Sequence, residues 1–266
     1  MYPYKRLSLI FLLCVVSTSV IANEMILVPG GEYQLGSHQK ERSWAYQNSP
    51  DIVGQQQWYD AWESSPQAIM LSPFLLDKYP VTQREYEIYI AKFDYASPYI
   101  SPQEYQSQGF LVYSYDAVRQ YLWDNQNAPK NRLDHPVVLV SKTDAENYCA
   151  AQGKRLPHEH EWEAACRGMS QRTFPWGEQW LGDAAQHNKT GTGAVSAHPL
   201  GKTPDGIYDL IGNVFEWTST PYGTNKTSLK GCSWDDAPGT CRCAFRHGRP
   251  SKSRHILIGF RCAKDY

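Results

Sequence analysis

The clearest periodic pattern of apolar positions lies between residues 82 and 93. Aromatic and aliphatic residues recur there at the spacing of one helix face, which predicts an amphipathic helix with that face in the core. Thr82 and Glu85 have the spacing of a capping box at the start of a helix. The residues of the apolar face are Tyr86, Tyr89, Ile90 and Phe93.

Shorter patterns predict further elements. Residues 25–37 alternate as a strand that is interrupted by a Pro-Gly-Gly turn. The apolar run 136–140 predicts a short buried strand. Residues 143–152 and 158–167 predict two helices, and a glycine follows each of them as a stop signal.

The remaining chain has weak periodicity. Residues 38–66 are polar apart from three tryptophans, so we interpret them as a long surface excursion. Residues 94–134 are rich in Tyr, Gln and Pro and predict irregular structure, and turns with short strands dominate from residue 174 onward. No internal repeat or low-complexity linker divides the chain, so we expect residues 23–266 to form one loop-rich domain.

The first residues have the pattern of a secretory signal peptide. Lys5 and Arg6 precede the apolar run 7–16, and small or tolerated residues lead to a cleavage site after Ala22. A lipid anchor on Cys14 is disfavoured because the preceding residue is a leucine rather than a small residue. We therefore expect residues 1–22 to be removed and the mature protein to be periplasmic or secreted.

Composition narrows the choice of partners. The 266 residues carry a formal net charge of −1, so no polyanion such as a nucleic acid is expected as a partner. Nine Trp and eighteen Tyr suit a domain in which large rings fill irregular gaps. Beyond the leader no apolar run is long enough to span a bilayer.

The segment 206–217 carries the first candidate chemistry. Asp209, Asn213 and Glu216 bracket Gly212 inside an otherwise apolar and aromatic run. Burying two carboxylates is costly unless something neutralises them. A hard cation such as Ca²⁺ would do so, since it takes carboxylate and carbonyl oxygens together. Two ordinary surface carboxylates are the alternative.

The cysteines indicate disulfides. Removal of Cys14 with the leader leaves six of the seven cysteines, and an even number in an exported chain is typical of a disulfide framework. Sequence alone does not choose among the possible pairings.

Several blocks resemble, in order, the formylglycine-generating enzyme (sulfatase-modifying factor) family. The resemblance covers essentially the whole mature chain. The blocks are residues 25–37, 77–86, 135–138, 144–163, 174–177, 206–217, 230–234 and 258–263.

The resemblance implies an α+β fold that is loop-rich, has little regular secondary structure and is related to C-type-lectin-like architectures. Members of this family oxidise a cysteine of a sulfatase peptide to formylglycine, using copper held by two cysteines. Relatives catalyse iron-dependent sulfoxide synthesis or the maturation of a peptide siderophore chromophore.

The resemblance also implies structural sites. A calcium ion would be held by Asp209, the carbonyls of Gly212 and Val214, and Glu216, all hard oxygen donors. In the alternative, the two carboxylates accept backbone N–H bonds. The implied disulfides are Cys149–Cys262 and Cys166–Cys243.

The copper centre of the family is not implied for this chain. Asp236 and Pro238 stand where the two copper-binding cysteines are expected. Cys232 and Cys241 then remain as a third disulfide, a relocated redox pair or a displaced copper site. Ser233 matches a serine of the family's active site, although a serine before a tryptophan is also an ordinary turn residue.

A basic segment follows these cysteines. Trp234, Arg246 and Arg249 lie in the part of the chain that lines the family's substrate groove, and they could hold an acidic ligand. A solvated loop face is the alternative. The run 158–161 alternates His and Glu, but the two histidines are expected to face different ways on a helix, which disfavours a metal site.

Two hypotheses follow for the function. The first is an exported oxidoreductase that modifies or matures a peptide or peptide-derived substrate without the copper pair, with Cys232, Cys241 and Ser233 as candidate catalytic residues and its redox metal unidentified. The second is an inactive binding or accessory module that keeps the calcium-stabilised scaffold. We expect a monomer in either case.

Overall fold

The computed structural model describes residues 24–108 and 113–266, so the predicted signal peptide lies outside the described residues. The β structure consists of small sheets. One contains, in spatial order, β1 (Met25–Val28), β4 (Phe74–Asp77) and β9 (Ala263–Asp265). A second pairs β2 (Gly31–Leu35) with β3 (Gln67–Leu71). A third contains, in spatial order, β7 (Arg246–Pro250), β6 (Lys226–Lys230), β5 (Phe215–Pro221) and β8 (Ile258–Gly259).

The predicted strand over residues 25–37 becomes two strands in different sheets. β1 pairs antiparallel with β4, whereas β2 pairs antiparallel with β3. The Pro-Gly-Gly turn between them depends on close backbone approach. A Cβ on Gly30 would lie 2.8 Å from Cδ of Pro73, and Gly31 has a φ of +153°. The turn therefore redirects the chain from one sheet to the other.

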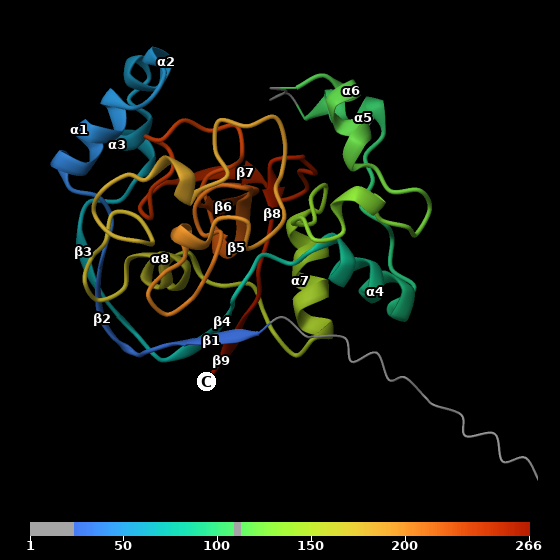
Figure 1. The fold of residues 1–266 in the computed structure, drawn as a ribbon, viewed down its shortest axis with the longest axis horizontal. Helices are drawn as coiled ribbons and strands as arrows, with labels where there is room; N and C mark the ends of the chain where they lie inside the picture. Colours follow the sequence, from blue (N-terminus) through green and yellow to red (C-terminus); the bar gives the residue numbers. More distant parts are fainter. Residues whose placement is uncertain (1–23, 109–112) are drawn as a thin grey trace, which may run out of the picture.

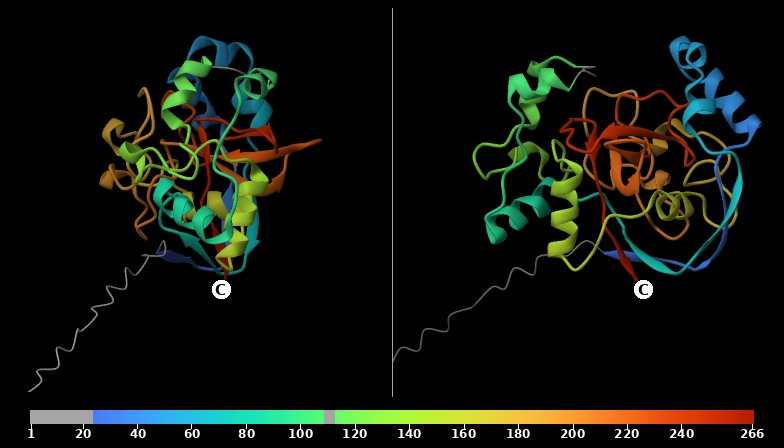
Figure 2. Two further views of the ribbon diagram at one scale, coloured as in Figure 1. Left: turned by 90° about the vertical axis from the view of Figure 1, so that its right-hand side faces the viewer. Right: turned by 180° about the vertical axis from the view of Figure 1, so that it is seen from behind.

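The helices lie on two sides of the four-stranded sheet, as Figure 1 and the rear view in Figure 2 show. On one side are α1 (Gln39–Gln47), α2 (Asp51–Gln55) and α3 (Trp58–Trp62). On the other are α4 (Gln83–Phe93), α5 (Pro102–Ser107), α6 (Tyr115–Val118) and α7 (Lys142–Ala151). The helix α8 (Glu159–Arg167) packs near β2, β5 and β6. Short 3₁₀ turns are η1 (Arg119–Tyr121), η2 (Lys130–Arg132), η3 (Gly182–Ala184) and η4 (Pro199–Gly201).

The three predicted helices are confirmed, with boundaries set by caps. Thr82 caps α4 in a capping box with Glu85, and Ser141 caps α7 in the same way. His158 caps α8. The rings of His158 and His160 lie 4.8 Å apart, so the expectation that they face different ways is wrong.

Two other expectations about local structure are wrong. Residues 137–140 are fully buried but form no strand, since Leu139 adopts a φ of +62°, which ends any extended run. The expected excursion at residues 38–66 contains α1–α3 instead. These helices are built on buried side chains such as Ala45 and Tyr59. Their surfaces are so polar that the sequence pattern conceals their periodicity.

Disulfides join the central helices to the C-terminal part of the chain. Cys149 of α7 pairs with Cys262, and Cys166 of α8 pairs with Cys243, as the family resemblance implied. A third disulfide links Cys232 and Cys241. In the chain-entropy model each of the two long loops contributes about 4 kcal/mol or more. No helix within residues 24–108 and 113–266 is long and apolar enough to cross a membrane.

A buried ion network lies where α1, α8, β6 and the C-terminal segment meet. Glu163 accepts hydrogen bonds from Arg167 Nε at 2.9 Å, from Lys230 Nζ at 2.9 Å and from Gly36 N at 2.7 Å. Burial alone would raise the pKa of Glu163, but Lys230 and Arg167 outweigh it and lower the pKa to about 2. The carboxylate is therefore ionised at any pH at which the protein is expected to fold.

Glu163→Gln should destabilise the protein by about 3–5 kcal/mol, because Lys230 would remain buried without a charge partner and Arg167 would keep only Glu41. Urea unfolding measures this loss. Glu146→Gln, which breaks the exposed pair with Lys142, is the matched control and should change stability by no more than about 0.5 kcal/mol. Equal losses of unfolding free energy in the two variants would show that the buried ion pairs of Glu163 contribute no more to stability than the pair between Lys142 and Glu146.

Candidate functional site

The candidate site lies in the loop that follows β6. Gly231 has a φ of +83°, and a Cβ there would come 2.8 Å from the carbonyl oxygen of Leu210, so the turn requires glycine. Cys232 and Cys241 close this loop, and both residues are fully buried. Cys232 Sγ also accepts a hydrogen bond from Gly212 N at 3.0 Å. The disulfide thus fixes the loop against the turn at residues 209–213.

Ser233 is clamped by two carboxyl groups in this loop. Its Oγ lies 2.6 Å from Asp235 Oδ1 and 2.5 Å from Asp236 Oδ2, and its backbone N–H donates to Asp236 Oδ2 at 2.8 Å. A hydroxyl has a single hydrogen to donate. This hydrogen can bridge both carboxylates in a three-centre bond, or one carboxyl group can be protonated and donate to Oγ. The arrangement is therefore able to hold an additional proton.

The electrostatics agree with this geometry. Burial of the carboxyl and the neighbouring charge of Asp235 raise the pKa of Asp236 to about 7. Tyr113 donates from its hydroxyl to Asp235 Oδ2 at 2.9 Å and so orients that carboxylate. Burial and Asp235 raise the pKa of Tyr113, which keeps it a donor. Asp235, Asp236 and Tyr113 keep part of their surface exposed, whereas Ser233 has none, so solvent reaches the carboxyl groups but not the hydroxyl.

Trp234 lies beneath the cluster. It exposes 2% of its surface, its ring centroid is 5.1 Å from that of Tyr113, and its carbonyl accepts from Lys189 N at 2.7 Å. The residue therefore positions Tyr113 and the loop.

The structure separates the two arginines that the sequence placed in one groove. They are three residues apart on β7, so their side chains leave opposite faces of the strand. Arg246 pairs with Glu159 at 2.6 Å and donates from Nε to the carbonyl of Trp62. Arg249 lies close enough to Asp236 to lower its pKa. Of the two, Arg249 belongs to the electrostatic surroundings of the Ser233 cluster.

The other basic residues of this segment do not form a solvated face. Arg242 is fully buried and pairs with Glu63 and with Glu41, and Arg254 pairs with Asp144 at 2.6 Å. His247 is buried, and its Nδ1 has no hydrogen-bond partner within the described residues. Burial lowers the pKa of His247 well below its usual range, so the ring is neutral.

The segment expected to hold calcium forms a buried turn. Asp209 and Gly212 both have positive φ, and the carboxylate of Asp209 accepts from Ser196 N at 2.9 Å. Glu216 is fully buried. Arg261 donates to both of its carboxylate oxygens at 2.8 Å, and Trp162 Nε1 donates to Oε2 at 2.8 Å.

These residues fit a divalent cation on charge and on donor capacity. Asp209, Glu216 and Arg261 together leave one negative charge in a buried place, and burial raises the pKa of Asp209. Glu216 Oε1 accepts a single hydrogen bond, from Arg261, and so keeps a lone pair for a ligand bond. Asp209, Glu216 and the carbonyls of Gly212 and Val214 would form the hard-oxygen set that Ca²⁺ takes.

The sequence analysis did not identify the carboxyl pair Asp235 and Asp236, or Tyr113, as site residues. The signal that could have found the pair is the run Ser-Trp-Asp-Asp at residues 233–236, where two carboxylates directly follow a family active-site serine. Tyr113 is far away in the chain and had no such signal. Within the described residues, no group of three or more His, Cys, Asp or Glu side chains is arranged to hold a metal ion.

Comparison with known proteins identifies the family. Residues 15–266 match the sulfatase-modifying factor enzyme 1-like domain. The chain belongs to this family.

Relatives in this family include enzymes and proteins named as inactive. The chain is 29% identical to inactive C-alpha-formylglycine-generating enzyme 2 of Mus musculus, over 91% of this chain and 85% of that protein. It is 30% identical to formylglycine-generating enzyme of Thermomonospora curvata, over 94% of this chain and 96% of that protein. Membership therefore leaves open whether the chain is active.

Solved structures confirm the expected α+β, loop-rich fold. PvdO from Pseudomonas aeruginosa superposes with a TM-score of 0.66 at 21% identity, over 91% of this chain and 94% of that chain. CarF superposes with a TM-score of 0.61 at 19% identity, over 93% of this chain and 100% of that chain.

The pKa of Asp236 predicts a pH-dependent stability. Because the pKa is about 7 when folded and near 3.8 in the unfolded chain, protonation of Asp236 stabilises the fold fully below pH 3.8, and this contribution is lost as the pH rises through 7. Asp236→Asn is neutral at every pH. Denaturant unfolding between pH 4.5 and 8 should therefore show a smaller loss of stability in Asp236→Asn than in the parent protein.

The control for this comparison is Asp116→Asn, at an exposed pair with Arg119. It should follow the pH dependence of the parent protein. An Asp236→Asn profile with the same slope as the parent would show that Asp236 is ionised throughout and does not share a proton with Ser233.

Proposed function

We propose that this protein is an exported family member that modifies or matures a peptide or peptide-derived substrate without a copper–thiolate centre. The Ser233–Asp235–Asp236 cluster would supply its proton transfers. The observation that supports this most is the single hydroxyl held within 2.6 Å of two carboxyl oxygens, an arrangement that can hold a shared proton. The leader pattern and the three disulfides support export into an oxidising compartment.

The cysteines support the absence of copper–thiolate chemistry. Copper of the family type needs two thiolates, but Cys232 and Cys241 are bonded to each other and fully buried. Burial also disfavours an easily reduced redox pair, because an attacking thiolate needs access to a sulfur. The residues at the expected copper positions, Asp236 and Pro238, cannot replace thiolates.

The cluster is suited to general acid–base catalysis. A group with a pKa of about 7 can both hold and release a proton at neutral pH, which is the condition for such catalysis. The partly exposed carboxyl groups of Asp235 and Asp236 would exchange the proton with a bound substrate. The buried hydroxyl of Ser233 would link the two groups, and Tyr113 would keep Asp235 in position. Proton transfer alone serves maturation reactions that leave the oxidation state unchanged, and oxidation of a peptide carbon centre would need an external oxidant to accept the electrons as well.

A binding or accessory module is the second candidate. The buried Cys232–Cys241 disulfide favours it, because this bond occupies the two thiols that remain in the region of the family's active site. In that case the Ser233 cluster would serve as a hydrogen-bonding surface for a peptide.

Mass spectrometry of exported peptides and metabolites from the native host tests both candidates. A strain with the parent protein should contain a mass-shifted product that is missing after gene deletion and reduced at least about 100-fold by Asp236→Asn. Asp116→Asn should retain the product. If the parent and deletion strains have identical products, the protein is a binding module and the catalytic proposal fails.

We also propose a calcium ion at the 209–216 turn. Adding calcium to EDTA-treated protein should raise the Tm by about 5 °C or more. Asp209→Asn removes a ligand charge and also an uncompensated buried carboxylate. It should therefore weaken the calcium response, because an amide oxygen remains but its charge is lost, while the variant stays at least as stable as the parent protein in EDTA. A parent protein whose Tm and elemental composition are unaffected by calcium would contradict the site.

A further inference from the structure

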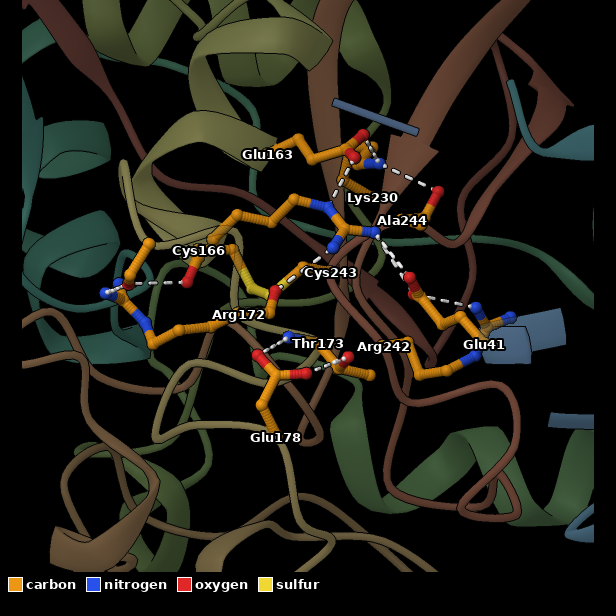
Figure 3. Close-up of a disulfide and its surroundings, with 12 residues drawn as sticks. Glu41, Glu163, Cys166, Arg172, Thr173, Glu178, Lys230, Arg242, Cys243 and Ala244 are labelled. Atoms are coloured by element: carbon orange, nitrogen blue, oxygen red, sulfur yellow. Dashed lines mark hydrogen bonds and ion pairs between the residues drawn. A yellow bond between two sulfur atoms is a disulfide. The ribbon is translucent and has the colours of Figure 1, made fainter. Parts of the chain in front are cut away.

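A cavity of about 480 Å³ lies away from the Ser233 cluster, between α1, β2 and the loop that follows α8. This volume is typical of small-molecule sites. Three of its lining residues surround the Cys166–Cys243 disulfide in Figure 3, with Glu41 to the right of the disulfide and Thr173 and Glu178 below it. The cavity is thus built at a junction of segments far apart in sequence.

The floor of the cavity is rigid and charge-balanced. Arg167 donates from NH2 to both oxygens of Glu41 at 3.1 Å and to the carbonyl of Gly36 at 2.8 Å. Arg242 Nη1 also donates to Oε1 of Glu41, at 3.0 Å. The side chains of Arg167 and Glu41 expose 3% and 8% of their surface. These groups already satisfy each other, so they form a fixed polar surface rather than a strong anion or cation site.

One wall of the cavity is aromatic. The ring of Trp44 packs edge-to-face against that of Phe174, with centroids 5.3 Å apart. Phe174 in turn stacks on Trp176 at 5.4 Å. Leu35 continues the apolar surface from β2. Phe174 and Leu35 expose 1% of their surface each and support the wall from within, whereas Trp44 is partly exposed. The ring of Trp44 is therefore the surface that suits a flat or bulky apolar group.

The rim carries one charge of each sign. Lys40 projects from the exposed part of α1 and forms no ion pair within residues 24–108 and 113–266. Glu178 is also exposed, and its oxygens accept from Thr173 N and Thr173 Oγ1. A carboxylate has capacity for further donors beyond these two. The rim therefore offers a cation for a carboxylate and an anion for an ammonium group.

We propose that this cavity binds a zwitterionic amino acid with an aromatic or large apolar side chain, as a free molecule. Its carboxylate meets Lys40, its ammonium group meets Glu178, and its side chain lies against Trp44. A single cation at the rim is insufficient for a phosphate-rich ligand.

Calorimetry with the purified protein tests the pairing of each charge. L-phenylalanine should bind saturably, whereas L-phenylalanine amide and N-acetyl-L-phenylalanine, which lack one charge each, should bind about five- to tenfold more weakly. Lys40→Gln should weaken L-phenylalanine binding by a similar factor and leave the amide unchanged. Glu178→Gln should weaken L-phenylalanine binding and leave the N-acetyl form unchanged.

Lys92→Gln, on an exposed part of α4, is the matched control and should bind like the parent protein. Because both rim residues are exposed, their variants should fold normally, which an unchanged Tm checks. The proposal is overturned if no zwitterionic aromatic or large apolar amino acid binds at millimolar concentration. It is equally overturned if amide and acid bind alike, or if Lys40→Gln has no effect.

Discussion

The structure depends on a charge network that has almost no access to solvent. Arg242, with no exposed surface, pairs with Glu63 and Glu41, and its guanidinium lies 4.7 Å from the ring centroid of Tyr59. Arg167 and Glu163 extend the same network into α8. Ions buried to this degree are tolerated only when each has its partner. The network therefore fixes how the α1–α3 segment sits on the rest of the domain, which hydrophobic contacts alone would specify less sharply.

The Cys166–Cys243 disulfide and the buried ion network constrain the same segments of the chain. The Cys166–Cys243 disulfide joins α8 to the residue next to Arg242, and Cys243 N donates to the carbonyl of Thr173 at 3.1 Å. Removing conformational freedom from these segments lowers the entropy cost of aligning the ions. The same rigidity keeps the cavity above the network open, because its floor cannot relax to fill it. Stability and a preformed cavity are thus two consequences of one arrangement.

Sequence patterns predicted the features that depend on neighbouring residues, such as where a helix begins. The predicted capping box of Thr82 and Glu85 lies where α4 begins, since a cap and its helix are within one turn of each other. Family blocks supplied the pairing of the long-range cysteines. Neither source could predict that Leu139 takes a positive φ, because that depends on packing by distant segments. Tyr113 likewise reaches Asp235 across a separation of 122 residues, which no pattern reveals.

The Ser233 loop contains both the positions at which the resemblance expects the family's copper-binding cysteines and the proposed proton-sharing group. Asp236 stands at one of these positions, and its carboxylate lies 2.5 Å from the serine hydroxyl. The Cys232–Cys241 disulfide closes the loop around that contact. A soft-metal site cannot be restored by a single return to cysteine, because the second position is Pro238. The geometry is instead complete as a proton-sharing group, and Trp234 and Tyr113 hold it in place from two sides.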